Sequence, residues 1–126
     1  MRRVVESAAA PRPLGPYSHA IDTGALVFCA GQIGLDPGTG RLVQGGTAAE
    51  AEQAIRNLVA VLAATGLGLV DVAKTTVFLV DLTDGPAVSD VYARLFPSPY
   101  PARSTVQVAA LPAGARVEIE AIAVRA

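Results

Sequence analysis

Residues 100–124 read YPARSTVQVAALPAGARVEIEAIAV, and this stretch decides the fold. Two runs rich in β-branched and apolar residues, 105–108 and 117–124, predict two strands joined by a loop that contains proline and glycine. Side chains two residues apart lie on the same face of a strand. Glu118 and Glu120 therefore share one face of the second run, and the opposite face is entirely apolar.

Two charged side chains in this stretch are candidates for chemistry. Arg103 follows Pro101 and opens the first run, and Glu118 lies near the start of the second. An unpaired charge among apolar residues is costly, so the glutamates need partners or a hydrated pocket. The spacing fits equally well two glutamates that are solvated at the end of a strand, and both interpretations stay open on spacing alone.

Length and composition favour a single domain, residues 1–126, that makes contacts with other subunits. The chain has 126 residues, of which 52% are hydrophobic. It is long enough to build a core without disulfides or metals. No uninterrupted apolar run approaches the ~20 residues of a membrane-spanning helix. We therefore expect no membrane association and expect the excess hydrophobic residues to be buried between subunits.

Charge and cysteine content exclude several classes of protein. The net charge is -1, and its acids and bases are scattered, which leaves no basic stripe for nucleic acid and no polybasic tail for membranes. The N-terminus lacks the apolar segment of a secretory signal. Cys29 is the only cysteine and His19 the only histidine, so a multi-cysteine metal site is excluded. We expect a cytoplasmic protein without metal dependence.

Two helices are predicted between strands. Thr47 and Glu50 have the spacing of a capping box, in which a hydroxyl caps the helix and a glutamate three residues later bonds back. This helix is expected to end near Gly66. The second helix begins near Pro86, a residue typical of a first helical turn. The remaining predicted strands cover residues 2–5, 21–22, 26–30 and 72–82.

The predicted order is therefore β-β-β-α-β-α-β-β, which favours a mixed sheet with both helices on one face. The strands at 26–30, 75–80 and 119–124 are apolar on both faces. Two helices cover only one face, and soluble monomers rarely expose a large apolar patch. We infer that other copies of the chain cover the second face in a closed ring.

Seven short blocks point to one known family. They are Gly15-Pro16-Tyr17-Ser18, Ala30-Gly31-Gln32-Ile33, Asp36-Pro37-Gly38-Thr39-Gly40, Lys74-Thr75-Thr76-Val77-Phe78, Asp81-Leu82, Pro101-Ala102-Arg103-Ser104 and Val117-Glu118-Ile119-Glu120-Ala121. In this order they resemble the RidA/YjgF family of reactive-intermediate (enamine/imine) deaminases. The resemblance runs from about Leu14 to the C-terminus, and its most specific part joins the Arg103 block to the Glu118 block.

The resemblance implies a chorismate-mutase-like α+β fold with a six-stranded mixed sheet. It also implies a homotrimer with a central barrel and with sites between subunits. The implied reaction is hydrolysis of 2-aminoacrylate-type enamines and their imine tautomers, which pyridoxal-phosphate enzymes release from serine or threonine. The products are a 2-oxo acid and ammonium, and no cofactor is required.

The resemblance also implies roles for individual residues. Arg103 anchors the substrate carboxylate in a bidentate pair, and the backbone N–H of Thr105 adds a second contact. Glu118 is the general acid and base that activates water. Tyr17 borders the cleft and Gly31 lets a ligand approach closely.

Each of these roles has an alternative. Arg103 fits an ion pair between subunits, Tyr17 fits plain packing, and turn geometry explains Gly31. Ser89 is a marginal substrate contact. Glu120 rivals Glu118, although the resemblance favours Glu118 and makes Glu120 a structural partner in the barrel.

Two further residues are not assigned to catalysis. His19 has no Ser, Cys or Asp partner at a recognisable spacing, so it is expected to lie behind the site or on the surface. Cys29 is expected to be a buried, inert thiol.

Two departures from the family pattern affect substrate preference. Ala30 stands where members often have serine, and Thr105 replaces their usual cysteine. A relative specialised for another pathway intermediate is therefore an alternative to a general imine deaminase. A non-catalytic binding module or holdase that uses the same clefts is a third. Nuclease activity, attributed to some relatives, is disfavoured by the lack of a basic patch.

Overall fold

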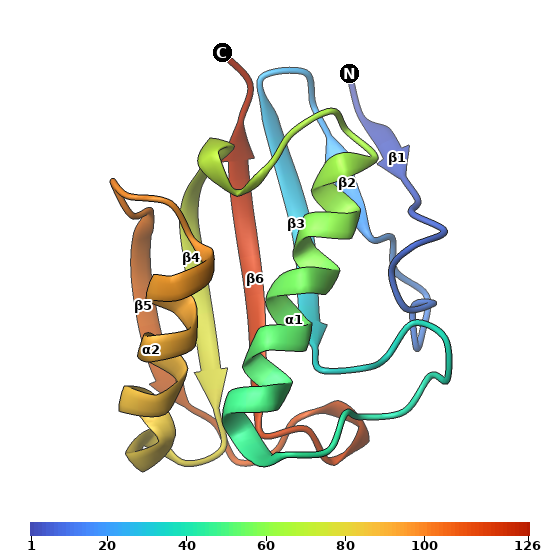
Figure 1. Cartoon of the computed structure of the whole chain (residues 1–126). Helices are drawn as coiled ribbons and strands as arrows, with labels where there is room; N and C mark the ends of the chain where they lie inside the picture. The colour runs from blue at the N-terminus through green and yellow to red at the C-terminus, as the bar shows by residue number, and fades with distance from the viewer.

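Six strands form one sheet, and two helices lie on one of its faces (Figure 1). The computed structural model describes residues 1–126. The strands are β1 (Arg3–Val5), β2 (Ala20–Asp22), β3 (Leu26–Ile33), β4 (Val72–Leu79), β5 (Ala102–Gln107) and β6 (Val117–Val124), and the helices are α1 (Gly46–Ala63) and α2 (Gly85–Leu95). Short 3-10 turns cover Leu69–Asp71, Leu82–Asp84 and Pro112–Gly114. The predicted order of strands and helices is confirmed.

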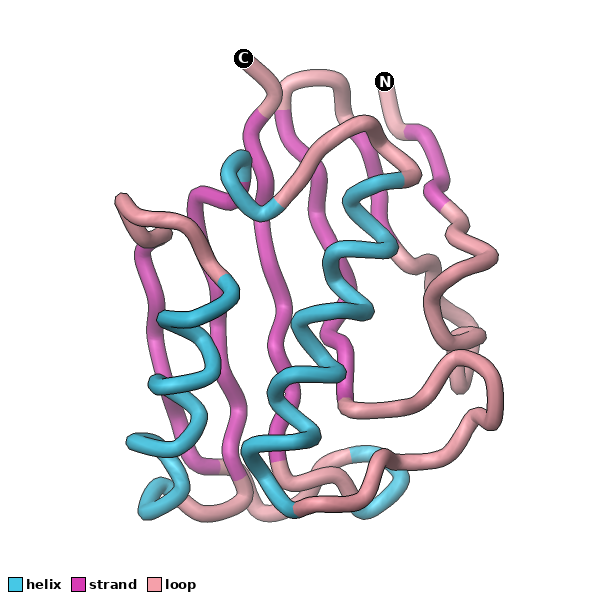
Figure 2. Tube along the Cα trace, in the orientation of Figure 1, coloured by secondary structure: helices cyan, strands magenta, loops and turns pink.

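The last strand in the sequence occupies the middle of the sheet. The spatial order is β1-β2-β3-β6-β4-β5. Only β4 and β5 pair in parallel, and every other pair is antiparallel. Figure 2 shows both helices crossing in front of these strands. The mixed sheet with both helices on one face is therefore confirmed.

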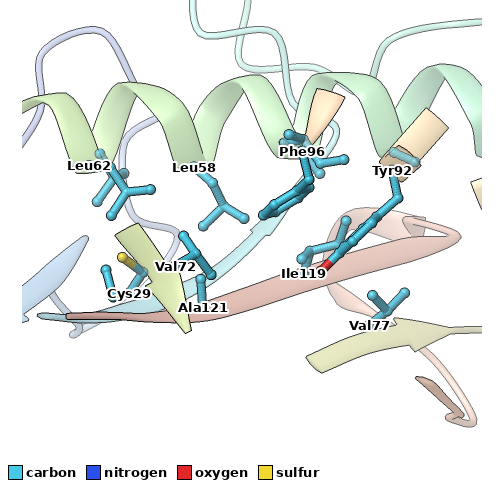
Figure 3. Packing of buried hydrophobic residues seen from close by; sticks show 14 of the residues in the cluster. Cys29, Leu58, Leu62, Val72, Val77, Tyr92, Phe96, Ile119 and Ala121 are labelled. Atoms are coloured by element: carbon cyan, nitrogen blue, oxygen red, sulfur yellow. The ribbon is translucent and has the colours of Figure 1, made fainter. Parts of the chain in front are cut away.

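The core lies between the two helices and the sheet (Figure 3). Alternate residues of β6 starting at Val117 are buried, and those starting at Glu118 are half-buried or exposed. This matches the two faces predicted from the period of two. From α2, the ring of Tyr92 stacks on Phe96 at 4.2 Å between centroids. Burial of this continuous apolar layer holds the helices against the sheet.

The predicted capping box at the start of α1 is wrong. The helix begins at Gly46, and its N-cap is Gly45, whose φ of 117° favours glycine. Thr47 instead donates its hydroxyl to Asp84 at 2.8 Å. The carboxylate of Glu50 is 1% exposed and accepts from the backbone N–H and the guanidinium of Arg116, each at 2.8 Å. Both side chains are used for tertiary contacts, which local spacing does not reveal.

Several strands differ in length from their predicted bounds, and β4 ends at Leu79 instead of residue 82. β3 continues to Ile33 instead of ending at residue 30, and β5 begins at Ala102 instead of residue 105. The register against β6 shifts between Cys29 and Gln32, so β3 carries one extra residue there. Such a bulge bends a strand and redirects neighbouring side chains. It lies beside Glu118, which pairs with Ile33.

The second face of the sheet is left open and carries exposed apolar side chains. Phe28, Val106 and Val124 are 43%, 42% and 41% exposed. Register places Ile122 opposite Phe28 on this face. Cys29 points the other way and is buried, as expected, and burial raises the pKa of its thiol to about 11. Neither helix combines the length and the apolar character needed to cross a bilayer.

A candidate active site in two halves

Glu118 lies in a small hollow beside the bulged end of β3. The hollow is bordered by the segment that precedes β2, by the end of β3 and by the turn before β6. Its lining comprises Pro11, Arg12, Pro13, Leu14, Tyr17, His19, Gly31, Gln32, Ile33, Leu35, Pro112 and Glu118. Three of the predicted site residues, Tyr17, Gly31 and Glu118, therefore meet in one place.

Gly31 leaves the space that the Glu118 carboxylate occupies. A Cβ added at Gly31 would lie 2.6 Å from Oε2 of Glu118 and 2.8 Å from its Cδ. That is too close for non-bonded atoms, so any larger residue would move the carboxylate. The structure thus gives Gly31 a use that the sequence did not reveal, and the expected approach of a ligand to its backbone stays a prediction.

The Glu118 carboxyl holds its proton more tightly than an ordinary glutamate. Burial in the hollow is the larger cause that raises its pKa, and the like charge of Glu120 on the same strand face adds to it. A carboxylate with a raised pKa is a better proton acceptor from water, which suits general acid–base work near neutral pH.

We expect Gly31→Ala to lower kcat/KM by about tenfold or more, because small misplacements of a catalytic group are costly. The fold should survive, since the clash is with the end of one side chain. Gly85→Ala is the matched control, because no atom lies within 4 Å of a Cβ added there. Activity of both variants is measured on the same imino acid. Equal activity of the two variants would contradict the role given to Gly31.

A second prediction concerns the pH profile. If Glu118 must be ionised to accept a proton, kcat/KM falls as the pH drops through its raised pKa. Glu120→Gln removes the like charge, so the pKa of Glu118 decreases and the acid limb moves to lower pH. Glu52→Gln, which removes a carboxylate on α1, should leave the limb in place. An unchanged acid limb in Glu120→Gln would contradict the coupling of the two carboxylates.

The hydroxyl of Tyr17 accepts a hydrogen bond within the chain but does not donate one. The side chain is 48% exposed, and its oxygen accepts the backbone N–H of Leu14 at 3.0 Å. Since a phenol both donates and accepts, the O–H proton remains available for a ligand or a water. This geometry fits the predicted position of Tyr17 at the border of the cleft.

Arg103 lies in a second hollow, formed between β5 and α2. Its Nη2 donates to the hydroxyl of Ser89 at 3.0 Å, and its Cζ lies 4.7 Å from the centroid of the Tyr92 ring. The hollow is lined by Ser89, Tyr92, Ala93, Tyr100, Pro101 and Arg103. Arg103 has no carboxylate partner within the chain. A planar cation held from behind by an aromatic ring presents its free donors to a carboxylate.

The predicted site residues divide between the two hollows. Ser89, a predicted substrate contact, bonds to Arg103. It therefore lies in the Arg103 hollow and not in the Glu118 hollow. Thr105 is two residues from Arg103 on the same strand and therefore shares its face. Sequence reasoning missed Tyr92 and Tyr100. Ser89 and Tyr92 are three residues apart on α2, which places them on one helix face, and this spacing was the available signal.

The two hollows lie on opposite faces of the sheet. Glu118 pairs with Phe78 of β4, and Arg103 pairs with Thr75. Thr75 and Phe78 are three residues apart, so their side chains point to opposite faces. One chain alone therefore does not bring Arg103 and Glu118 together.

The only histidine is part of the wall of the Glu118 hollow. His19 is 4% exposed, so the expected alternative of a surface position is wrong. No three side chains of histidine, cysteine, aspartate or glutamate gather into a group that could hold a metal ion.

Comparison with known proteins gives consistent matches along the chain. Residues 7–125 match the family model described as endoribonuclease L-PSP. A human protein named 2-iminobutanoate/2-iminopropanoate deaminase is 47% identical over 125 residues, which is 99% of this chain and 91% of that protein. The crystal structure of RidA from a Psychrobacter species has a TM-score of 0.95 and 43% identity, covering 98% and 100% of the two chains. That of E. coli TdcF with bound serine has a TM-score of 0.94 and 39% identity, covering 98% and 99%.

Proposed function

The chain belongs to the RidA/YjgF family, and from this membership we propose that it hydrolyses reactive enamines and imines of the 2-aminoacrylate type to 2-oxo acids and ammonium. The match to the family model and the similarity to the named relatives confirm the resemblance noted in the sequence. The observation that carries the proposal is the half-buried Glu118 carboxyl, whose pKa is raised in a hollow that Tyr17 borders. The full-length similarity to a named imine deaminase supports the same activity.

We further propose that three copies assemble with their open sheet faces turned inward around a barrel. The exposed Phe28, Val106 and Val124 support this, because covering such a face releases water from apolar surface. In this assembly the Arg103 hollow of one protomer faces the Glu118 hollow of its neighbour. Each complete site then takes one half from each of two chains.

In the complete site, Arg103 binds the carboxylate of the imino acid. Its guanidinium forms two parallel hydrogen bonds with the two carboxylate oxygens, which fixes the orientation of the substrate as well as its charge. Ser89 and the Tyr92 ring hold the guanidinium from behind. The backbone N–H of Thr105 provides a further donor to the same carboxylate.

Glu118 acts on the imine carbon held in this way. An enamine is first protonated by solvent at its methylene carbon, which gives the iminium form of the imine. Glu118 then accepts a proton from a water as the water oxygen bonds to the imine carbon, which gives a tetrahedral amino alcohol. The carboxyl returns the proton to the nitrogen and the C–N bond breaks. The hydroxyl proton passes to the departing ammonia, which leaves as ammonium while the carbonyl of the 2-oxo acid forms. The Tyr17 hydroxyl donates to the attacking water or to the substrate.

The distribution of arginines favours a small anion over a nucleic acid. Five arginines are bonded to carboxylates: Arg3, Arg56, Arg94, Arg116 and Arg125. Arg103 is held on an aromatic ring instead, with donors to spare. A phosphate backbone is bound through many cations at once, whereas one positioned guanidinium matches one carboxylate. Arg2, Arg12 and Arg41 also lack a carboxylate partner, but none of them is held on an aromatic ring. The cytoplasmic location and the independence of metal and cofactor stay predictions.

A hydrolysis panel tests the proposed function. An amino-acid oxidase, or a serine or threonine dehydratase, generates the imino acid in place, and the appearance of the 2-oxo acid is followed with and without the chain. We expect the chain to accelerate this step. Ranking several imino acids also tests whether Ala30 and Thr105 select a narrower substrate, which is the specialised alternative. No acceleration with any small imino acid would overturn the proposal.

A further inference from the structure

The wall of the Glu118 hollow is made of irregular chain. Between β1 and β2 the backbone forms no regular helix or strand. Its prolines, Pro11, Pro13 and Pro16, have no N–H to donate. Few backbone hydrogen bonds hold this segment: Ala10 N–H donates to Ser7, and Tyr17 N–H donates to Gly15. The segment nevertheless supplies Tyr17 and much of the lining of the hollow, so something else must fix its shape.

His19 connects the separate parts of this wall. Its Nδ1 accepts the backbone N–H of Ser7 at 3.0 Å, and its Nε2 lies 2.7 Å from the carbonyl oxygen of Pro11. Its own carbonyl oxygen accepts the N–H of Ala30 at 3.0 Å, next to Gly31 in β3. One buried residue thus joins both ends of the turn from Ser7 to Pro11 to the strand beside Glu118.

The partners of the ring fix its protonation state. A carbonyl oxygen only accepts, so Nε2 must carry the hydrogen. A backbone N–H only donates, so Nδ1 must be bare. The imidazole is therefore a neutral tautomer with both nitrogens in use, and neither is free to exchange a proton with substrate.

We propose that His19 is a positioning residue for the proposed imine hydrolysis, holding residues 7–17 so that the hollow keeps the substrate and water against Glu118. This inference rests on the proposed function. The substrate carboxylate is anchored by Arg103 in the other half of the site. Loss of the His19 contacts therefore lowers kcat more than it raises KM.

The test compares two replacements of His19. Glutamine offers an amide N–H and an amide oxygen, so His19→Gln can bond both Pro11 and Ser7. Leucine fills similar space and offers neither, so His19→Leu leaves both backbone groups without their partner. We expect His19→Leu to lose about tenfold or more in kcat, with KM changed by less than about threefold, and His19→Gln to stay within about threefold of wild type.

A control separates positioning from general loss of stability. The buried hydroxyl of Thr65 bonds the Leu62 carbonyl at 2.7 Å, just after α1, and Thr65 does not line the Glu118 hollow. Thr65→Val should lower thermal stability yet leave kcat unchanged at temperatures where the chain is folded. Hydrogen exchange gives a readout besides activity, because the Ser7 amide should exchange faster in His19→Leu than in wild type or His19→Gln.

The outcomes are distinct. An inactive wild-type chain would overturn the proposed function itself. An active wild type together with equal kcat in His19→Leu and His19→Gln would overturn only the positioning role. Rescue by glutamine, with slower exchange at Ser7, supports it.

Discussion

Replacing Glu118 with glutamine is expected to lower kcat for imine hydrolysis by about 10²–10⁴-fold, the usual contribution of a positioned general acid–base group. Glutamine keeps the shape of the side chain beside Gly31 but cannot accept a proton from water. If Arg103 anchors the substrate from the other half of the site, as proposed, KM should change little. The rate of 2-oxo acid formation, with the imine generated in place, provides the measurement.

The same variant has a second expected property, an unchanged or higher melting temperature at pH 7. Since burial raises the pKa of Glu118, the folded chain binds this proton more tightly than the unfolded chain. That contribution to stability is complete below the unfolded pKa and is lost as the pH rises through the folded pKa. Once the carboxyl is ionised its buried charge opposes folding, and an uncharged amide removes this cost. A stable and inactive variant excludes misfolding as the cause.

No hydrolysis by the wild-type chain, together with unchanged ligand binding in Glu118→Gln, would instead favour the binding module or holdase. A module of that kind needs only the shape and donors of the cleft, which glutamine preserves. Activity near the wild-type level in Glu118→Gln would contradict the proposed hydrolysis by Glu118.

Mixing two inactive variants is expected to restore activity. Arg103→Ala removes the carboxylate anchor, and Glu118→Gln removes the proton acceptor, so each variant alone should be nearly inactive. If every site takes Arg103 from one protomer and Glu118 from another, mixed trimers contain some sites in which both residues are intact. Random assembly from equal amounts predicts about a quarter of the wild-type activity.

The mixture is prepared by joint unfolding and refolding, or by co-expression, and its activity is compared with each variant treated alone. Size-exclusion chromatography with light scattering checks that the trimer forms. A mixture that forms trimers but remains inactive would show that the two residues do not share a site across the interface. A monomeric wild-type chain would contradict the assembly directly.

Much of the fold could be predicted from local patterns in the sequence. The bounds of β6 and its two faces were predicted because apolar side chains alternate there with a period of two. The positions of both helices followed from glycines, prolines and apolar stripes. Each of these patterns lies within a single element, and the structure contains the elements that the patterns predict.

The errors arose where distant residues meet. Thr47 and Glu50 have the spacing of a cap, yet Asp84 and Arg116 bind them from elsewhere in the chain. The bulge in β3 depends on its register with a strand almost a hundred residues later, which no local pattern encodes. Similarly, the sequence identified Arg103 as a candidate, but the only signal for the aromatic ring that supports it was the spacing of Ser89 and Tyr92 on α2.

The central position of β6 has a consequence for biosynthesis. Its neighbours β3 and β4 are translated first, and neither can pair with the other, because the strand that separates them is still inside the ribosome. Sheet closure must wait until β6 has emerged, and contacts between remote segments form slowly. Until then β3 and β4 each carry an unpaired edge, which makes this the period when a chaperone would matter most.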